Sequence, residues 1–151
     1  MTQTEPGRQV VVAGIDGSPE SVAALSWAGR YAAATGATVR AVRVWHFPAA
    51  AGLPPEGKAP PAVTSEIEQR MRDEVADAIA KANVPASVQV DTVIGYGHPA
   101  QVLIDESKTA SLLAVGHRGH GGFTEMLTGS VAIHLVSHAA CPVVVVREDR
   151  G

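Results

Sequence analysis

Short, uninterrupted runs of apolar residues constrain this chain more than any other feature of its sequence. The run VVVAGI at 10–15 and the run VVVV at 143–146 contain no polar residue that would mark a solvent-facing side. Such runs are typical of strands that are covered on both faces, as in a parallel sheet. Because parallel strands need crossover helices, the pattern predicts an α/β fold.

Segments of strand and helix character alternate along the whole chain. We expect strands at 10–15, 38–45, 87–94, 112–115 and 143–146, and helices at 20–34, at 65–83, just after Pro99 and ending near His138. Ser18 and Pro19 have the residue types that begin a helix, and Ser65 with Glu68 forms a capping-box pattern. Strands joined in this way imply right-handed crossovers and an open parallel sheet with helices on both faces.

The length of 151 residues suits a single domain, whose core we place at about 8–147. Residues 46–61 are rich in proline, alanine and glycine and show no periodicity, so we expect a mobile loop there. The sequence shows no internal repeat and no sign of a second domain.

Composition disfavours several classes of protein. The formal net charge is −3, from 12 Lys and Arg against 15 Asp and Glu, and such a chain lacks the positive field that binds nucleic acid. Cys141 is the single cysteine, which rules out an internal disulfide and disfavours a disulfide-stapled secreted domain. The first residues lack the pattern of a signal peptide, and no apolar run approaches the roughly 20 residues of a membrane span. We therefore expect a cytoplasmic protein that binds neither nucleic acid nor a membrane.

Glycine-rich segments follow two of the expected strands. In open parallel sheets, ligands bind beyond the carboxyl ends of the strands, where the strand order reverses. One segment begins at Gly14, and the other, at 116–122, holds four glycines in seven residues. Glycines leave room for backbone N–H groups to approach an anion closely. Gly129 and Ser130 then open the last helix, whose N-terminus suits a phosphate.

The second glycine-rich segment also has a simpler interpretation as a flexible turn. It is not a Walker P-loop, because it contains no lysine, and it does not match the G-x-G-x-x-G pattern of dinucleotide-binding proteins. The succession of strand, glycine loop and helix start favours phosphate binding over a plain turn. The sequence therefore predicts a nucleotide site of another type.

The spacing Gly116-x2-Gly119-x9-Gly129-Ser130 resembles the ATP-binding signature of the universal stress protein family. The segments 13–18 and 141–146 also resemble that family, so the likeness covers nearly the whole chain, and it is strongest with single-domain actinobacterial members. The resemblance implies a Rossmann-like, adenine-nucleotide-binding fold with a five-stranded parallel sheet in the order 3-2-1-4-5. It also implies a homodimer.

The resemblance further implies which residues hold the nucleotide. Asp16 matches the family's aspartate beside the nucleotide, and Val44 matches the residue that lines the adenine pocket. The positions that match the phosphate-binding residues or adjoin them are Gly116, Gly119, Gly121, Gly122, Gly129, Ser130 and Val131.

Charged and metal-ligating side chains near these positions have alternative interpretations. His117 and Arg118 either offer positive charge to a γ-phosphate, with Arg118 the better candidate because it stays charged, or are exposed loop residues. Asp16 either holds Mg²⁺ at the phosphates or is a turn residue bonded to its own backbone. His134 and His138 have the spacing of a metal-ligand pair, but solvated helix-surface or dimer-contact residues are the simpler interpretation.

These observations lead to one leading hypothesis and two alternatives. We expect the chain to bind ATP and act as a nucleotide-dependent regulator in a stress response, as a homodimer formed through the strand Val143–Val146. One alternative is a slow hydrolase of ATP or a related phosphoester that uses Asp16; the other is a dimeric interaction scaffold that needs no nucleotide. No residue is identified as catalytic, and we interpret Cys141 as buried and inert.

Overall fold

The computed structural model describes residues 8–46, 61–118 and 130–148. The elements in chain order are β1 (Val10–Ile15), α1 (Pro19–Thr35), β2 (Thr38–Trp45), α2 (Pro61–Ala82), β3 (Val90–Tyr96), α3 (Pro99–Ser107), β4 (Leu112–Gly116), α4 (Ser130–His138) and β5 (Val143–Val146). Neighbouring strands are parallel, and the sheet has the order β3-β2-β1-β4-β5. The expected fold class and strand order are therefore confirmed.

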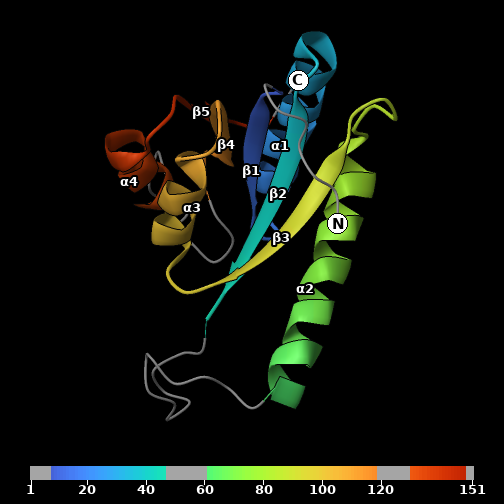
Figure 1. Cartoon of the computed structure of the whole chain (residues 1–151), viewed down its shortest axis with the longest axis vertical. Helices are drawn as coiled ribbons and strands as arrows, with labels where there is room; N and C mark the ends of the chain where they lie inside the picture. Colours follow the sequence, from blue (N-terminus) through green and yellow to red (C-terminus); the bar gives the residue numbers. More distant parts are fainter. Residues whose placement is uncertain (1–7, 47–60, 119–129, 149–151) are drawn as a thin grey trace.

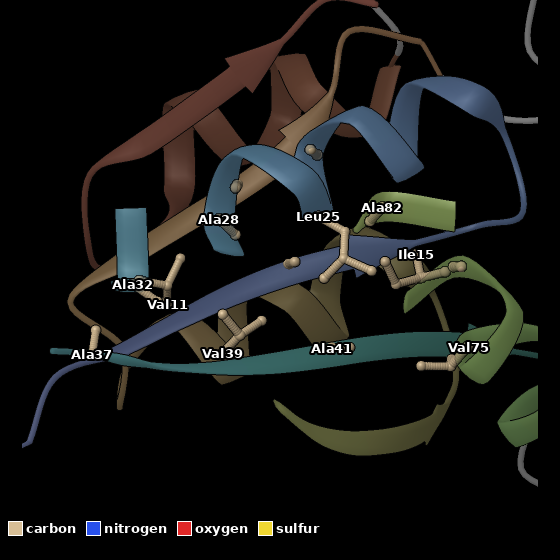
Figure 2. Close-up of a cluster of buried hydrophobic side chains, with 14 residues drawn as sticks. Val11, Ile15, Leu25, Ala28, Ala32, Ala37, Val39, Ala41, Val75 and Ala82 are labelled. Atoms are coloured by element: carbon tan, nitrogen blue, oxygen red, sulfur yellow. The ribbon is translucent and has the colours of Figure 1, made fainter. Parts of the chain in front are cut away.

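Two pairs of helices cover the two faces of the sheet (Figure 1). α1 and α2 share a buried cluster with one face, and α3 and α4 share a second cluster with the other. Figure 2 shows the first cluster, in which Leu25 and Ala28 of α1 pack with Val11 and Val39 of the sheet. Many members of this cluster are alanines, which let the helices lie close to the strands. None of the helices, as far as the structure describes them, is both long enough and apolar enough to cross a membrane.

β1 lies in the centre of the sheet, and this position explains why its sequence has no polar side. Val11 and Ala13 belong to the first cluster, whereas Val10 and Val12 belong to the second. Successive side chains of a strand point to opposite faces, and here both faces are covered by helices. An apolar residue is therefore favoured at every one of these positions.

α1 begins and ends at the residues that the sequence indicates. Ser18 is the N-cap, and its Oγ accepts a hydrogen bond from the backbone N–H of Ser21 at 3.1 Å. Gly36 closes the helix in the left-handed conformation, with φ of 78°, and its N–H donates to the Ala32 carbonyl at 2.8 Å. The Ser18 bond fixes the turn that connects β1 to α1, and the Gly36 bond ends the helix before β2.

The expected start of the second helix was wrong. α2 begins at Pro61, so Ser65 lies inside the helix and cannot be its N-cap. Proline suits the first helical turn, because its φ is already near the helical value and its missing N–H would have no partner there. Of the loop expected at 46–61, Pro61 is thus helical, and residues 47–60 lie outside the described residues.

The expected bounds of the third strand also needed correction. β3 starts at Val90 rather than at 87 and continues to Tyr96. Val88 belongs to a turn instead, since its N–H donates to the Pro85 carbonyl at 2.9 Å. From Val90 onward each residue of β3 pairs with β2, so the partner strand, and not the apolar alternation, sets the length of β3.

Candidate functional site

The centre of the sheet contains the point at which the strand order reverses. The chain passes from β1 to β2 and β3 on one side, and then returns to β4 on the other side of β1. β1 and β4 pair over only three positions, which end at Ala13↔Ala114. Beyond this point β1 stays paired with β2 as far as Ile15↔Arg43, and β4 stays paired with β5 as far as Gly116↔Val146. The carboxyl ends of β1 and β4 thus lose their shared ladder where open α/β sheets bind ligands.

The turn after β1 holds Asp16 in a fixed orientation. The backbone N–H of Ser18 donates to Asp16 Oδ1 at 3.0 Å, and the Ser18 hydroxyl donates to the same oxygen. The Ser21 hydroxyl donates to the Ser18 carbonyl oxygen at 2.9 Å. It also accepts a hydrogen bond from the backbone N–H of Asp16 at 3.4 Å. The structure therefore supports the interpretation of Asp16 as a turn residue, and it also orients this carboxylate beside the β1–β4 junction.

Gly116 closes β4 at a place where no side chain fits. A Cβ atom at Gly116 would lie 2.8 Å from the carbonyl carbon of Glu20 and 2.9 Å from its oxygen. These are backbone atoms of the first turn of α1, so they cannot move aside as a side-chain end would. Gly14 is less crowded, because its Cβ would meet side-chain carbons of Leu103 at 3.2 Å and of Val115 at 3.3 Å. Both glycines therefore have a packing role, whatever they also contribute to a ligand.

His117 and Arg118 directly follow β4. The N–H of His117 donates to the Val146 carbonyl at 2.7 Å, and the residue is only 7% exposed. The alternative that His117 is an exposed loop residue is therefore wrong, because its backbone extends the β4–β5 ladder by one bond. Arg118 is partly buried. The start of the glycine-rich segment 116–122 is thus anchored to the edge strand β5.

The other expected site residues divide into three groups. Val44, which is 8% exposed, and Val131, which is partly buried, belong to the same apolar cluster as Val115. Ser130 is exposed at the first position of α4. Four glycines of the expected phosphate site lie outside the described residues, namely Gly119, Gly121, Gly122 and Gly129. The described part of the site thus combines apolar residues with a helix N-terminus.

Two features near these strand ends were not singled out from the sequence. Glu20, besides its contact with Gly116, accepts a hydrogen bond through Oε2 from the Glu148 N–H at 2.8 Å. Trp45 and Tyr96, at the ends of β2 and β3, form an edge-to-face pair with ring centroids 4.8 Å apart, and Tyr96 is 44% exposed. An acidic residue in the first turn of a helix is a sequence feature that could have drawn attention to Glu20. No local sequence feature connects two aromatic residues on separate strands.

Cys141 lies away from these strand ends, in the turn between α4 and β5. It is partly buried, and burial raises the pKa of its thiol. The thiolate is the nucleophilic form, so a raised pKa agrees with the interpretation of Cys141 as inert. Within the described part of the chain, no group of three or more His, Cys, Asp or Glu residues is arranged to hold a metal ion.

Sequence comparison connects nearly all of this chain to known proteins. The sequence profile described as the universal stress protein family matches residues 7–147. A universal stress protein of Mycolicibacterium smegmatis is 37% identical over 142 residues, which are 93% of this chain and 46% of that protein. One from Methanocaldococcus jannaschii is 31% identical, over 93% of this chain and 82% of its own length. The chain therefore spans about half the length of the mycobacterial relatives but most of the archaeal one.

Solved structures share the fold at low sequence identity. The universal stress protein UspA from Lactobacillus plantarum aligns with a TM-score of 0.71 at 24% identity, over 93% of this chain and 99% of that one. A universal stress protein in complex with cAMP aligns at 0.67 with 24% identity, over 93% of this chain and 98% of that one. One from Archaeoglobus fulgidus in complex with dAMP aligns at 0.62 with 18% identity, over 92% of this chain and 97% of that one.

Proposed function

The chain belongs to the universal stress protein family, and from that premise we propose that it binds ATP and acts as a nucleotide-dependent regulator in a stress response. The observation that carries the proposal is the separation of β1 from β4 beyond Ala13↔Ala114, with Asp16 and Gly116 on either side. Open α/β sheets bind their ligands at this position. The structural neighbours described with cAMP and dAMP support an adenine nucleotide as the ligand class.

The described residues suit the two chemically different ends of such a ligand. Val44 offers an apolar surface of the kind that a purine base contacts. Ser130 and the first N–H groups of α4 offer hydrogen-bond donors and the positive end of a helix dipole, which suit a phosphate. We assign the remaining phosphate contacts to Gly119, Gly121, Gly122 and Gly129 from the family signature.

Asp16 and Arg118 supply the charged groups of the proposed site. Ser18 orients the Asp16 carboxylate through two hydrogen bonds, and a carboxylate beside phosphates is the ligand that Mg²⁺ prefers. Where Mg²⁺ accompanies ATP, Asp16 would hold it. Arg118 would supply the positive charge of its guanidinium to the terminal phosphate. Gly14 and Gly116 would keep the ends of β1 and β4 in place beside the ligand, because a Cβ atom there would meet Leu103 and Val115 or the backbone of Glu20.

Regulation follows from the contacts between this site and the edge of the sheet. The N–H of His117 is bonded to β5, the edge strand through which we propose that two copies pair. A ligand that contacts His117 or Arg118 would therefore also act on β5. By linkage, ATP would favour the arrangement of β5 in which the protein has the higher affinity for ATP. The proposed role is a cytoplasmic switch whose surface depends on nucleotide, and not an enzyme selected for turnover.

Isothermal titration of the purified protein with ATP, with and without Mg²⁺, tests the proposal. The Gly129→Glu variant places a negative charge at the proposed phosphate site, and Ser137→Glu adds the same charge to the exposed far end of α4 as a control. We expect ATP to bind the unaltered protein and the control alike. Its affinity for Gly129→Glu should fall by at least about tenfold, which corresponds to roughly 1.4 kcal/mol.

Competing nucleotides and a turnover assay separate the proposal from its alternatives. AMP, cAMP and GTP, titrated under the same conditions, report whether the triphosphate and the adenine base are both recognised. Release of phosphate that disappears in Asp16→Ala would favour the hydrolase alternative instead. No heat at millimolar ATP would contradict the proposal and leave a protein that works through its interactions alone.

A further inference from the structure

His134 and His138 form a pair of imidazoles on the exposed side of α4. They are one helical turn apart, and neither is buried. Their ring centroids lie 4.4 Å apart, and the ring planes differ by 20°, so the rings are stacked. Residues four apart are neighbours on a helix surface, but flexible side chains at that spacing often point apart. Here the two rings instead lie together on one side of the helix.

A hydrogen bond fixes the tautomer of one member of this pair. His138 Nδ1 lies 3.0 Å from the backbone carbonyl oxygen of His134. A carbonyl oxygen only accepts hydrogen bonds, so Nδ1 carries the proton and donates it. In the neutral ring, Nε2 of His138 then has the lone pair. Metal-binding histidines are typically oriented in this way, with one ring N–H donated to a backbone carbonyl and the other nitrogen on the metal.

We propose that His134 and His138 form a two-ligand site for a divalent transition-metal ion, independent of the nucleotide site. Imidazole nitrogen suits Zn²⁺, Ni²⁺ and Cu²⁺, and affinity for such ligands is highest for Cu²⁺. The stacking places both rings on the same side of α4, as the two ligands of one ion must lie. Because His138 is already oriented by its hydrogen bond, part of the ordering cost of binding is met in the free protein.

The site is open, which determines how it would work. No third His, Cys, Asp or Glu joins the pair among the residues that the structure describes. Two protein ligands leave the other coordination positions to water or to a group from another molecule. The ion would therefore exchange readily and would act as a bridge for an external donor, unlike a structural zinc site with four protein ligands.

A purely structural role for the pair makes a different prediction. The His138 ring bonds a carbonyl in the last turn of α4, where a positive charge is also favoured by the helix dipole. If that were its whole function, replacing either histidine would change stability slightly and would leave metal binding unaltered. Metal affinity, and not stability, is thus the quantity that separates the two roles.

The test is a titration of tag-free protein, without nucleotide, with Cu²⁺, Ni²⁺ and Zn²⁺ salts, followed by calorimetry and by the electron paramagnetic resonance spectrum of Cu²⁺. His134→Ala and His138→Ala each remove one ligand from an exposed position. The control His98→Ala removes another exposed histidine, which makes no side-chain capping bond to α3. We expect one ion per chain, an affinity at least about tenfold lower in the first two variants, and no change in the control.

A rearranged variant tests the geometry and not only the composition. The double substitution Val136→His with His138→Val keeps the number of histidines but places them two residues apart, at positions that do not face each other. Val136 is 61% exposed, so this exchange should not disturb the core, and circular dichroism checks that the fold is kept. We expect the rearranged variant to bind as weakly as His138→Ala. Full affinity in this variant, or equal affinity in all variants, would overturn the proposal.

Discussion

Gly116 and Glu20 approach so closely that a single methyl group at Gly116 would collide with the backbone of α1. A Cβ atom at Gly116 would lie 2.8 Å from the Glu20 carbonyl carbon. The end of β4 and the first turn of α1 are therefore packed backbone against backbone. This contact ties together two of the segments that surround the proposed nucleotide site. It also explains why the strand closes on a glycine.

The contact predicts that Gly116→Ala destabilises the protein, although alanine is the smallest possible addition. Backbone atoms must shift to admit the methyl group, and overpacking of this kind costs about 1 to 3 kcal/mol. Gly14→Ala is the matched control, because its methyl group meets only side-chain carbons, at 3.2 and 3.3 Å. Urea unfolding should show the larger loss in Gly116→Ala, and equal losses would mean that α1 adjusts freely.

The turn after β1 predicts a stability cost for Ser18→Ala. Ser18 caps α1 through Ser21 and donates two hydrogen bonds to the Asp16 carboxylate. Loss of an N-cap hydroxyl costs about 1 to 2 kcal/mol, which urea unfolding measures. Ser137→Ala, at an exposed position on α4, should change the free energy of unfolding by less than about 0.5 kcal/mol. A Ser18→Ala variant as stable as this control would show that the cap is dispensable.

Cys141 should react slowly with iodoacetamide at neutral pH. Burial raises the pKa of its thiol, so less thiolate is present at a given pH than in an unperturbed cysteine. The alkylation rate should therefore rise with pH along a curve displaced to higher pH from that of the same protein in denaturant. Mass spectrometry of the modified chain follows both curves. Coincident curves, or faster reaction of the folded protein, would contradict the burial of this thiol.

Much of the fold could be predicted because its signals are local. β1 and β5 are uninterrupted apolar runs, and α1 lies between a serine cap and a left-handed glycine. The predicted starts of α2 and β3 were wrong for a common reason: each rested on a local sequence pattern that does not begin the element in the structure. Ser65 has the sequence of a cap but lies inside α2, and Val88 continues an apolar alternation but lies in a turn. Pro61 begins α2, and pairing with β2 sets the start of β3 at Val90.

The candidate site was predictable in position but not in its contacts. Glycines after two strands indicated the carboxyl edge of the sheet, and the sheet order places these strands side by side. The contact of Gly116 with Glu20 and the bond from His117 to Val146 join residues that are distant in sequence. No local pattern contains such information. His117 therefore looked like a loop residue, although its backbone belongs to the end of the sheet.

The proposed dimer rests on the outward-facing backbone of β5, which forms the edge of the sheet. The carbonyl group of Pro142, directly before β5, accepts a hydrogen bond from the Leu113 N–H at 3.0 Å, and that of Val146 accepts one from the His117 N–H at 2.7 Å. In a parallel ladder, residues that bond to one neighbour alternate with residues whose N–H and C=O groups point the other way. Val143 and Val145 therefore direct their backbone groups away from β4. An exposed edge of this kind pairs readily with a second chain.

This alternation predicts that Val145→Pro separates the dimer and keeps the fold. Proline removes the outward N–H of Val145, whereas all bonds from β5 to β4 remain, and edge strands tolerate proline at such positions. Light scattering after size exclusion should show the dimer mass for the unaltered protein and the monomer mass for the variant. The control Val144→Pro removes a ladder bond to β4, and it should instead lower the free energy of unfolding by about 1 kcal/mol or more. A dimer that survives Val145→Pro would place the contact between copies elsewhere on the molecule.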